Sequence, residues 1–146
     1  GCKSTQVLVV GKKEEVKQPL KPEFPATLPE VMEARRIRLP MPDGSHLYVL
    51  VSFLNVKPME VFANLGRSGQ DVYAYTEALG RLASLALRHG VEAKTLIKTL
   101  KGIRGRDVGV FGDQYIYSVP DALAIALDVT QNGYQGKTQE EAMQER

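Results

Sequence analysis

Between residues 34 and 65, apolar and polar side chains alternate in three short runs separated by turn residues. This period of two is typical of β-strands, because successive side chains of a strand point to opposite faces. Pro42-Asp43-Gly44 lies between the first two runs and favours a tight hairpin turn. The pattern therefore predicts a three-stranded antiparallel meander.

The second of these runs is apolar on both faces. One face carries Leu47, Val49, Val51 and Phe53, and the other carries Tyr48 and Leu50. Two apolar faces indicate the central strand of the sheet. The third run alternates as well, with the apolar residues Met59, Val61, Ala63 and Leu65.

After residue 69 the period changes from two to that of a helix. A helix from Gln70 to His89 would place a polar set on one side, consisting of Gln70, Glu77, Arg81, Ser84 and Arg88. The opposite stripe is predicted to face the core, and it consists of Val72, Tyr75, Leu79, Leu82 and Ala86. Glu77 and Arg81 are spaced for an ion pair on one helix face.

Two further helices follow. One covers about Glu92 to Lys101, with Ala93, Leu96, Ile97 and Leu100 inward, and the last opens at "SVPDALAIAL". In that phrase Ser118 and Asp121 have the spacing of a capping box. Strands followed by helices, without βαβ alternation, predict an α+β fold: a small antiparallel meander of three or four strands packed by two to three helices.

The order of segments predicts how the chain is divided. Prolines at 19, 22, 25 and 29 favour an extended linker over residues 19–33, with the compact domain over 34–133. Residues 1–18 hold one short β-like run, Gln6 to Val10, and the polar tail 134–146 is expected to be disordered. Because the chain starts with Gly1 instead of methionine, we expect a fragment or a processed product.

Composition narrows the class of protein. Of the 146 residues, 43% are hydrophobic and 25% are charged, as in ordinary globular domains. The net charge of +2 is too small to predict a nucleic-acid or membrane partner from the overall field. Cys2 is the one cysteine, so the chain cannot form an internal disulfide, and we expect a cytoplasmic protein.

The stretch "NLGRSGQD", residues 64–71, has two interpretations. Gly66, Arg67, Ser68 and Gly69 could bind an anion, because they precede a helix N-terminus with its free N–H groups. Alternatively, the stretch is a tight turn in which Ser68 caps the helix. The spacing matches neither the Walker pattern nor G-x-G-x-x-G, which favours the turn.

A basic run follows, without an acidic residue between positions 94 and 106. It consists of Lys94, Lys98, Lys101, Arg104 and Arg106. Such a run could contact an acidic protein, a nucleotide phosphate or single-stranded nucleic acid. It could equally be the solvated face of an amphipathic helix. The glycine-rich segment 102–112 is predicted to be an irregular loop.

Catalytic patterns are missing from the sequence. His46 and His89 have no cysteine or carboxylate around them at metal-ligand spacing, and no known nucleophile or zinc motif occurs. We therefore assign no catalytic, cofactor-binding or metal-ligating residue and expect a non-catalytic module.

Several phrases resemble the region that follows the catalytic barrel in adenosylcobalamin-dependent (class II) ribonucleotide reductases, called the TSCPD domain. The family phrase F-x-N-x-G-[KR]-[SA]-G-x-D corresponds to residues 62–71, and E-A-L-G-R-L to residues 77–82. L-K-G-I corresponds to residues 100–103, and S-[LV]-P-D-A to residues 118–122. The opening "GCKSTQV" partly resembles the end of the family's catalytic region.

The resemblance implies an accessory role in the reduction of ribonucleotides to deoxyribonucleotides. The chain would be a C-terminal domain or small subunit that binds the catalytic barrel, in cis or in trans, through its sheet and the face from Lys94 to Arg106. Adenosylcobalamin and the radical chemistry would belong to that barrel. The cysteine-rich tail of many family members is missing here. The alternative is a regulatory module that senses nucleotides or binds nucleic acid. Formation of a homo-oligomer is possible with either role.

Overall fold

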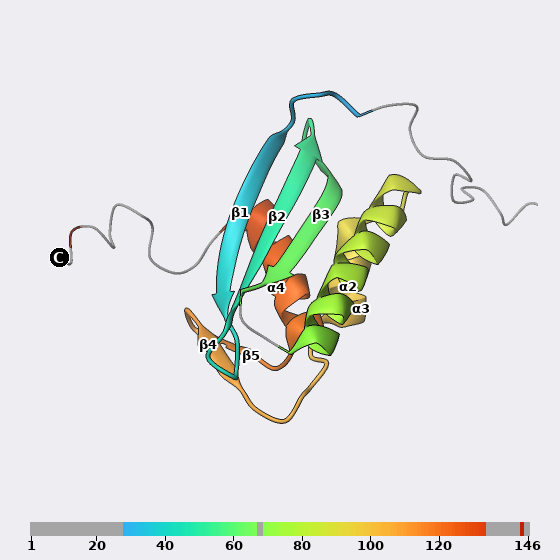
Figure 1. The fold of residues 1–146 in the computed structure, drawn as a ribbon. Helices are drawn as coiled ribbons and strands as arrows, with labels where there is room; N and C mark the ends of the chain where they lie inside the picture. Colours follow the sequence, from blue (N-terminus) through green and yellow to red (C-terminus); the bar gives the residue numbers. More distant parts are fainter. Residues whose placement is uncertain (1–27, 67–68, 134–143, 145–146) are drawn as a thin grey trace, which may run out of the picture.

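The computed structural model of the chain describes residues 28–66, 69–133 and 144. In these parts the chain forms two antiparallel sheets and three helices, an α+β architecture as predicted (Figure 1). The elements in chain order are β1 (Glu33–Pro40), β2 (His46–Leu54), β3 (Lys57–Leu65), α2 (Gln70–Arg88), α3 (Ala93–Leu100), β4 (Gly109–Phe111), β5 (Gln114–Ile116) and α4 (Val119–Asn132). The predicted run 6–10, most of the linker and the tail lie outside the described residues.

The larger sheet is the predicted meander, with strand order β1-β2-β3 and β2 in the centre. Its register places Val49 opposite Ile37 of β1 and opposite Ala63 of β3. In the β1–β2 turn, Asp43 Oδ1 accepts bonds from the Ser45 hydroxyl at 2.6 Å and the Ser45 N–H at 2.9 Å. These bonds stabilise the carboxylate and hold the pKa of Asp43 below its ordinary value.

The core lies between one face of this sheet and α4, which Figure 1 shows behind the strands. Leu39, Leu47, Val49 and Val51 on this inner face are fully buried. Helix α4 is buried continuously from Asp121 to Leu127, because the sheet covers one side of it and α3 packs against another. Each fully buried aliphatic side chain contributes about 1.5–3 kcal/mol relative to an exposed one.

Helix α2 packs along the edge strand β3 instead of covering a sheet face. A Cβ on Gly80 would lie 3.2 Å from the Val61 carbonyl oxygen, so glycine permits this close approach. Ser84 Oγ accepts a bond from the Val61 N–H at 2.8 Å and donates one to the Val61 carbonyl at 3.1 Å. The helix thereby satisfies backbone groups that an edge strand otherwise leaves open.

The predicted inward stripe of α2 is wrong for Val72, Tyr75 and Leu82, whereas Leu79 packs against the core as predicted. Tyr75 is 69% exposed and Leu82 is 60% exposed, whereas the buried positions are Thr76, Gly80, Ala83 and Leu87. The physical reason is the contact with β3: a strand edge requires small residues and a hydroxyl. Tyr75 and Leu82 are turned to solvent, while Leu87 is buried beside the strand.

The remaining helices agree with the sequence pattern. In α3, Ala93 is buried, and Leu96, Ile97 and Leu100 pack against the core from its margin. The glycine-rich segment differs from the predicted irregular loop, because residues 109–116 form the small β4–β5 hairpin. Three residues per strand are too few to give a clear alternating pattern.

Candidate functional site

The predicted anion turn joins β3 to α2. Gly66 donates its N–H to the His46 carbonyl at 3.0 Å, and Gly69 is the N-cap of α2 without a side-chain capping bond. The predicted Ser68 cap is therefore wrong, since the N-cap is Gly69. Arg67 and Ser68 themselves lie outside the described residues.

The basic run does not form one continuous site. Lys94 lies 3.7 Å from Glu92 and lines a small cavity beside the β2–β3 turn, whereas Lys98 and Lys101 are exposed. Arg104 stacks on the Tyr117 ring with 4.3 Å between guanidinium carbon and ring centroid. Arg106 lines a different cavity, of about 320 Å³. Leu65 and Val72, which flank the predicted anion turn, line that same cavity.

The phrases "LKGI" and "SVPDA" meet in one hydrogen-bonded unit. The buried carboxylate of Asp121 accepts the Gly102 N–H at 2.7 Å and the Tyr117 N–H at 3.0 Å. Ser118 Oγ accepts the Asp121 N–H at 3.2 Å and donates to the Ile103 carbonyl at 2.5 Å. Gly102 has φ +83°, a conformation that favours glycine. These residues thus fix the loop before α4.

A larger feature lies on the outer face of the sheet, away from α4. There the strands and α2 border an open groove of about 860 Å³. Its floor contains Tyr48, Leu50 and Phe62, whose exposed fractions are 37%, 37% and 54%. Leu50 and Phe62 are direct cross-strand partners, so the apolar floor is continuous from β2 to β3.

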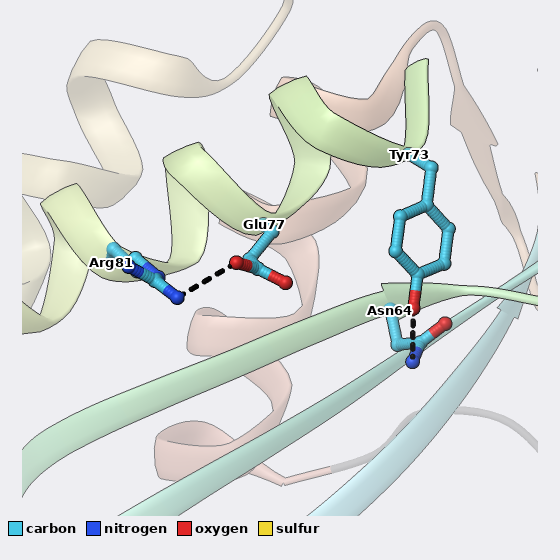
Figure 2. A network of polar contacts seen from close by, with 4 residues as sticks. All are labelled: Asn64, Tyr73, Glu77 and Arg81. Carbon is cyan, nitrogen blue, oxygen red and sulfur yellow. Dashed lines mark hydrogen bonds and ion pairs between the residues drawn. The ribbon is translucent and has the colours of Figure 1, made fainter. Parts of the chain in front are cut away.

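Polar side chains border this apolar floor. Arg81 forms an ion pair with Glu77 at 2.8 Å, as predicted, and Asn64 Nδ2 donates to the Tyr73 hydroxyl at 3.4 Å (Figure 2). Figure 2 shows these residues between α2 and the strand below it. On the β1 side, the Arg36 guanidinium lies 5.8 Å from the Tyr48 ring centroid. An apolar floor with a charged border is typical of a protein contact surface.

The resemblance implies a contact surface on the sheet, but the sequence pattern does not indicate which face it is or that α2 borders it. The apolar outer face of β2 predicts a central strand, which is confirmed, and the same side chains form the floor of the groove. A signal was present in β1, where Arg36 and Arg38 are the register partners of Leu50 and Tyr48. Arginines beside apolar residues on one face indicate that no part of the same domain covers that face.

The described residues offer no arrangement for metal binding: no group of three or more His, Cys, Asp or Glu side chains lies close enough together there to hold an ion. Within the same part of the chain, no helix is long and apolar enough to cross a bilayer.

Comparison with known proteins identifies one family. The family model of the TSCPD domain matches residues 20–131. Searches of curated proteins and of solved structures gave no match. Because the family match covers well over half of the sequence, this chain belongs to the TSCPD domain family.

Proposed function

We propose that this chain is a non-catalytic C-terminal domain or small subunit of an adenosylcobalamin-dependent ribonucleotide reductase. It supports the reduction of ribonucleotides to deoxyribonucleotides by binding the catalytic barrel, in cis or in trans. One observation supports this most directly: two of the four phrases on which the resemblance rests contribute side chains to the groove. Phe62 lies in its floor, and Asn64, Glu77 and Arg81 line it.

The groove is suited to a macromolecular partner because of its composition. Its floor is apolar and half exposed, so covering it releases water from Tyr48, Leu50 and Phe62 without disturbing the core. Its border offers arginine and glutamate side chains for pairing at the rim. Aromatic residues and arginines of this kind are the side chains that most often dominate binding energy at interfaces.

Our proposal places no cofactor in this groove. In our proposal the barrel holds adenosylcobalamin and supplies the radical chemistry, while this chain contributes a contact surface. The same proposal assigns the chain to the cytoplasm.

The proposal is tested by adding this chain to a class II catalytic barrel that lacks its own C-terminal region. We expect binding in a calorimetric titration and a gain in reductase activity. Phe62→Asp should weaken binding at least about tenfold, because it places a charge in the centre of the apolar floor. Val56→Asp is the matched control, since Val56 is 90% exposed in the β2–β3 turn.

Two results would contradict the proposal. One is equal binding by Phe62→Asp and the unchanged chain, which would remove the groove from the interface. The other is turnover of nucleotides by the isolated chain with cobalamin and a dithiol, which would make it a catalyst in its own right.

A nucleotide-sensing role is the second candidate, and one juxtaposition favours it. Arg106 shares its cavity with Leu65 and Val72, the residues on either side of the predicted anion turn. Asp43 and Asp107 line the same cavity, however, and their charges oppose an anion there. Calorimetry with nucleoside di- and triphosphates tests this role: Arg106→Ala should abolish the heat, while Lys98→Ala should leave it unchanged.

A further inference from the structure

Helix α2 carries an apolar stripe on the side that faces away from β3. It consists of Tyr75, Ala78, Leu82 and Leu85, which follow one another at steps of three, four and three residues. Tyr75 is 69% exposed, Leu82 60% and Leu85 45%, and Ala78 is exposed as well. We call these four residues the outer stripe. Their spacing is that of the a and d positions of a coiled coil, a pattern that serves to pack one helix against another.

We propose that the outer stripe binds the outer stripe of a second copy of this chain, with the two helices antiparallel across a two-fold axis. Reversing α2 about a centre near position 80 places Tyr75 opposite Leu85 of the second copy. The same operation places Leu82 opposite Ala78 of the second copy. Each large side chain at the centre then meets a small one, as close packing of two helices requires.

The charges along α2 select the antiparallel direction. Asp71 lies in its first turn and Arg88 in its last turn, whereas Glu77 and Arg81 pair with each other within the helix. An antiparallel pair brings the acidic first turn of one helix beside the basic last turn of the other. The helix dipoles are then opposed as well, which is favourable. A parallel pair would place Asp71 beside Asp71 and Arg88 beside Arg88.

The length of α2 sets the expected affinity. Nineteen residues form a rod of about 28 Å at 1.5 Å per residue. A pair of such helices buries less than the ~800 Å² per partner of a standard interface. We therefore expect a reversible dimer that dissociates in the micromolar range.

This inference is separate from the proposed binding to the barrel. Leu82 and Leu85 also reach the rim of the groove, but Tyr75 does not line it. Phe62, conversely, belongs to the groove floor and not to the outer stripe. Substitutions of Tyr75 therefore test the outer stripe alone, and substitutions of Phe62 test the groove alone.

Sedimentation equilibrium of the 146-residue chain over a range of concentrations tests the inference. We expect a monomer–dimer equilibrium whose dissociation constant rises at least about tenfold in Tyr75→Asp, since it removes an aromatic anchor. Phe62→Asp and Val56→Asp should dimerise like the unchanged chain. Circular dichroism verifies that all variants keep their helix content. A chain that is monomeric at every concentration overturns the inference and leaves the stripe to a helix of another protein.

Disulfide trapping tests the direction of the helices. In a chain with Cys2→Ser, the variants Tyr75→Cys and Leu85→Cys are oxidised separately and as a mixture. The antiparallel arrangement predicts a cross-linked dimer only in the mixture. Cross-linking of Tyr75→Cys alone would show parallel helices and overturn the arrangement.

Discussion

The two faces of β2 have similar residues and opposite surroundings. Leu47 and Val49 on the inner face are fully buried under α4, whereas Tyr48 and Leu50 on the outer face are 37% exposed. Both sides carry large apolar side chains, although His46 and Ser52 lie on the outer side as well. What differs is the helix: α4 covers the inner face, but α2 lies along the edge of β3, so no helix of the described residues covers the outer face (Figure 1).

This difference separates two roles of apolar residues in one strand. The inner face holds the domain together, and its loss should be visible in the free energy of unfolding. The outer face is exposed, and removing its apolar side chains should change the affinity for a partner more than the free energy of unfolding.

The largest effect is expected from replacing a leucine on the inner face of β2 by alanine, and the same replacement on the outer face is the comparison. Leu47→Ala removes a fully buried side chain and should lower the free energy of unfolding by about 2–5 kcal/mol. Leu50→Ala, three residues away, should cost less than about 1 kcal/mol because its face is open. Urea denaturation of both variants measures the difference. Equal losses would mean that the outer face is part of the core.

The next effect concerns the loop before α4. Asp121→Ala leaves the N–H groups of Gly102 and Tyr117 without the carboxylate that accepts their bonds, at a cost of about 1–3 kcal/mol. Asp128→Ala is the control on the same helix, because its carboxylate accepts a bond from the exposed Asn132 side chain. Hydrogen exchange at Gly102 and Tyr117 should accelerate in the first variant only. Unchanged protection there would refute the assignment of Asp121 as the anchor of this loop.

A smaller effect is expected at the edge of β3. Ser84→Ala removes the hydroxyl that bonds both backbone groups of Val61, and should cost about 1 kcal/mol. Thr99→Ala removes a hydroxyl that bonds the Thr95 carbonyl within α3 and controls for the gain in helix propensity. Thermal unfolding compares the two variants. If both are equally stable, Ser84 does not hold α2 to the sheet.

The smallest effect depends on pH and lies in the β1–β2 turn. The bonds from Ser45 lower the pKa of Asp43, so they stabilise the folded state when the carboxylate is ionised. Their contribution is fully present above the pKa of an unfolded aspartate and is lost as the pH falls through the lowered pKa. Because Asp43 is exposed and its charge is screened by solvent, Asp43→Asn should cost under about 0.5 kcal/mol at neutral pH, and the cost should shrink as the pH falls through the lowered pKa. A difference that is independent of pH would exclude this origin.

Much of the fold could be predicted because strand alternation and turn chemistry agree. Pro42-Asp43-Gly44 and the period of two define the meander without any reference to the helices. The capping bond of Ser118 was predictable for the same reason, since it depends on local spacing alone. The β4–β5 hairpin was missed because each of its strands has only three residues.

The position of α2 could not be read from its pattern. Periodicity identifies an apolar stripe, but it does not show whether the stripe meets the core or solvent. Helix α2 contacts a strand edge. There Gly80 permits a close approach and Ser84 forms hydrogen bonds with the strand backbone, so large apolar residues are not needed at these positions. The groove could not be predicted for the same reason, because α2 forms one of its sides and the position of α2 was not known from the sequence.

The contact between Ser84 and Val61 also limits how the sheet can grow. With both backbone groups of Val61 occupied and Gly80 against the strand, β3 cannot accept a further strand at its middle. Among the described residues, the other edge of the meander is β1, and it carries Arg35, Arg36 and Arg38. Two copies that approach edge to edge would bring these positive charges together. The described sheet can thus keep an apolar face exposed while both of its edges oppose pairing with a second sheet.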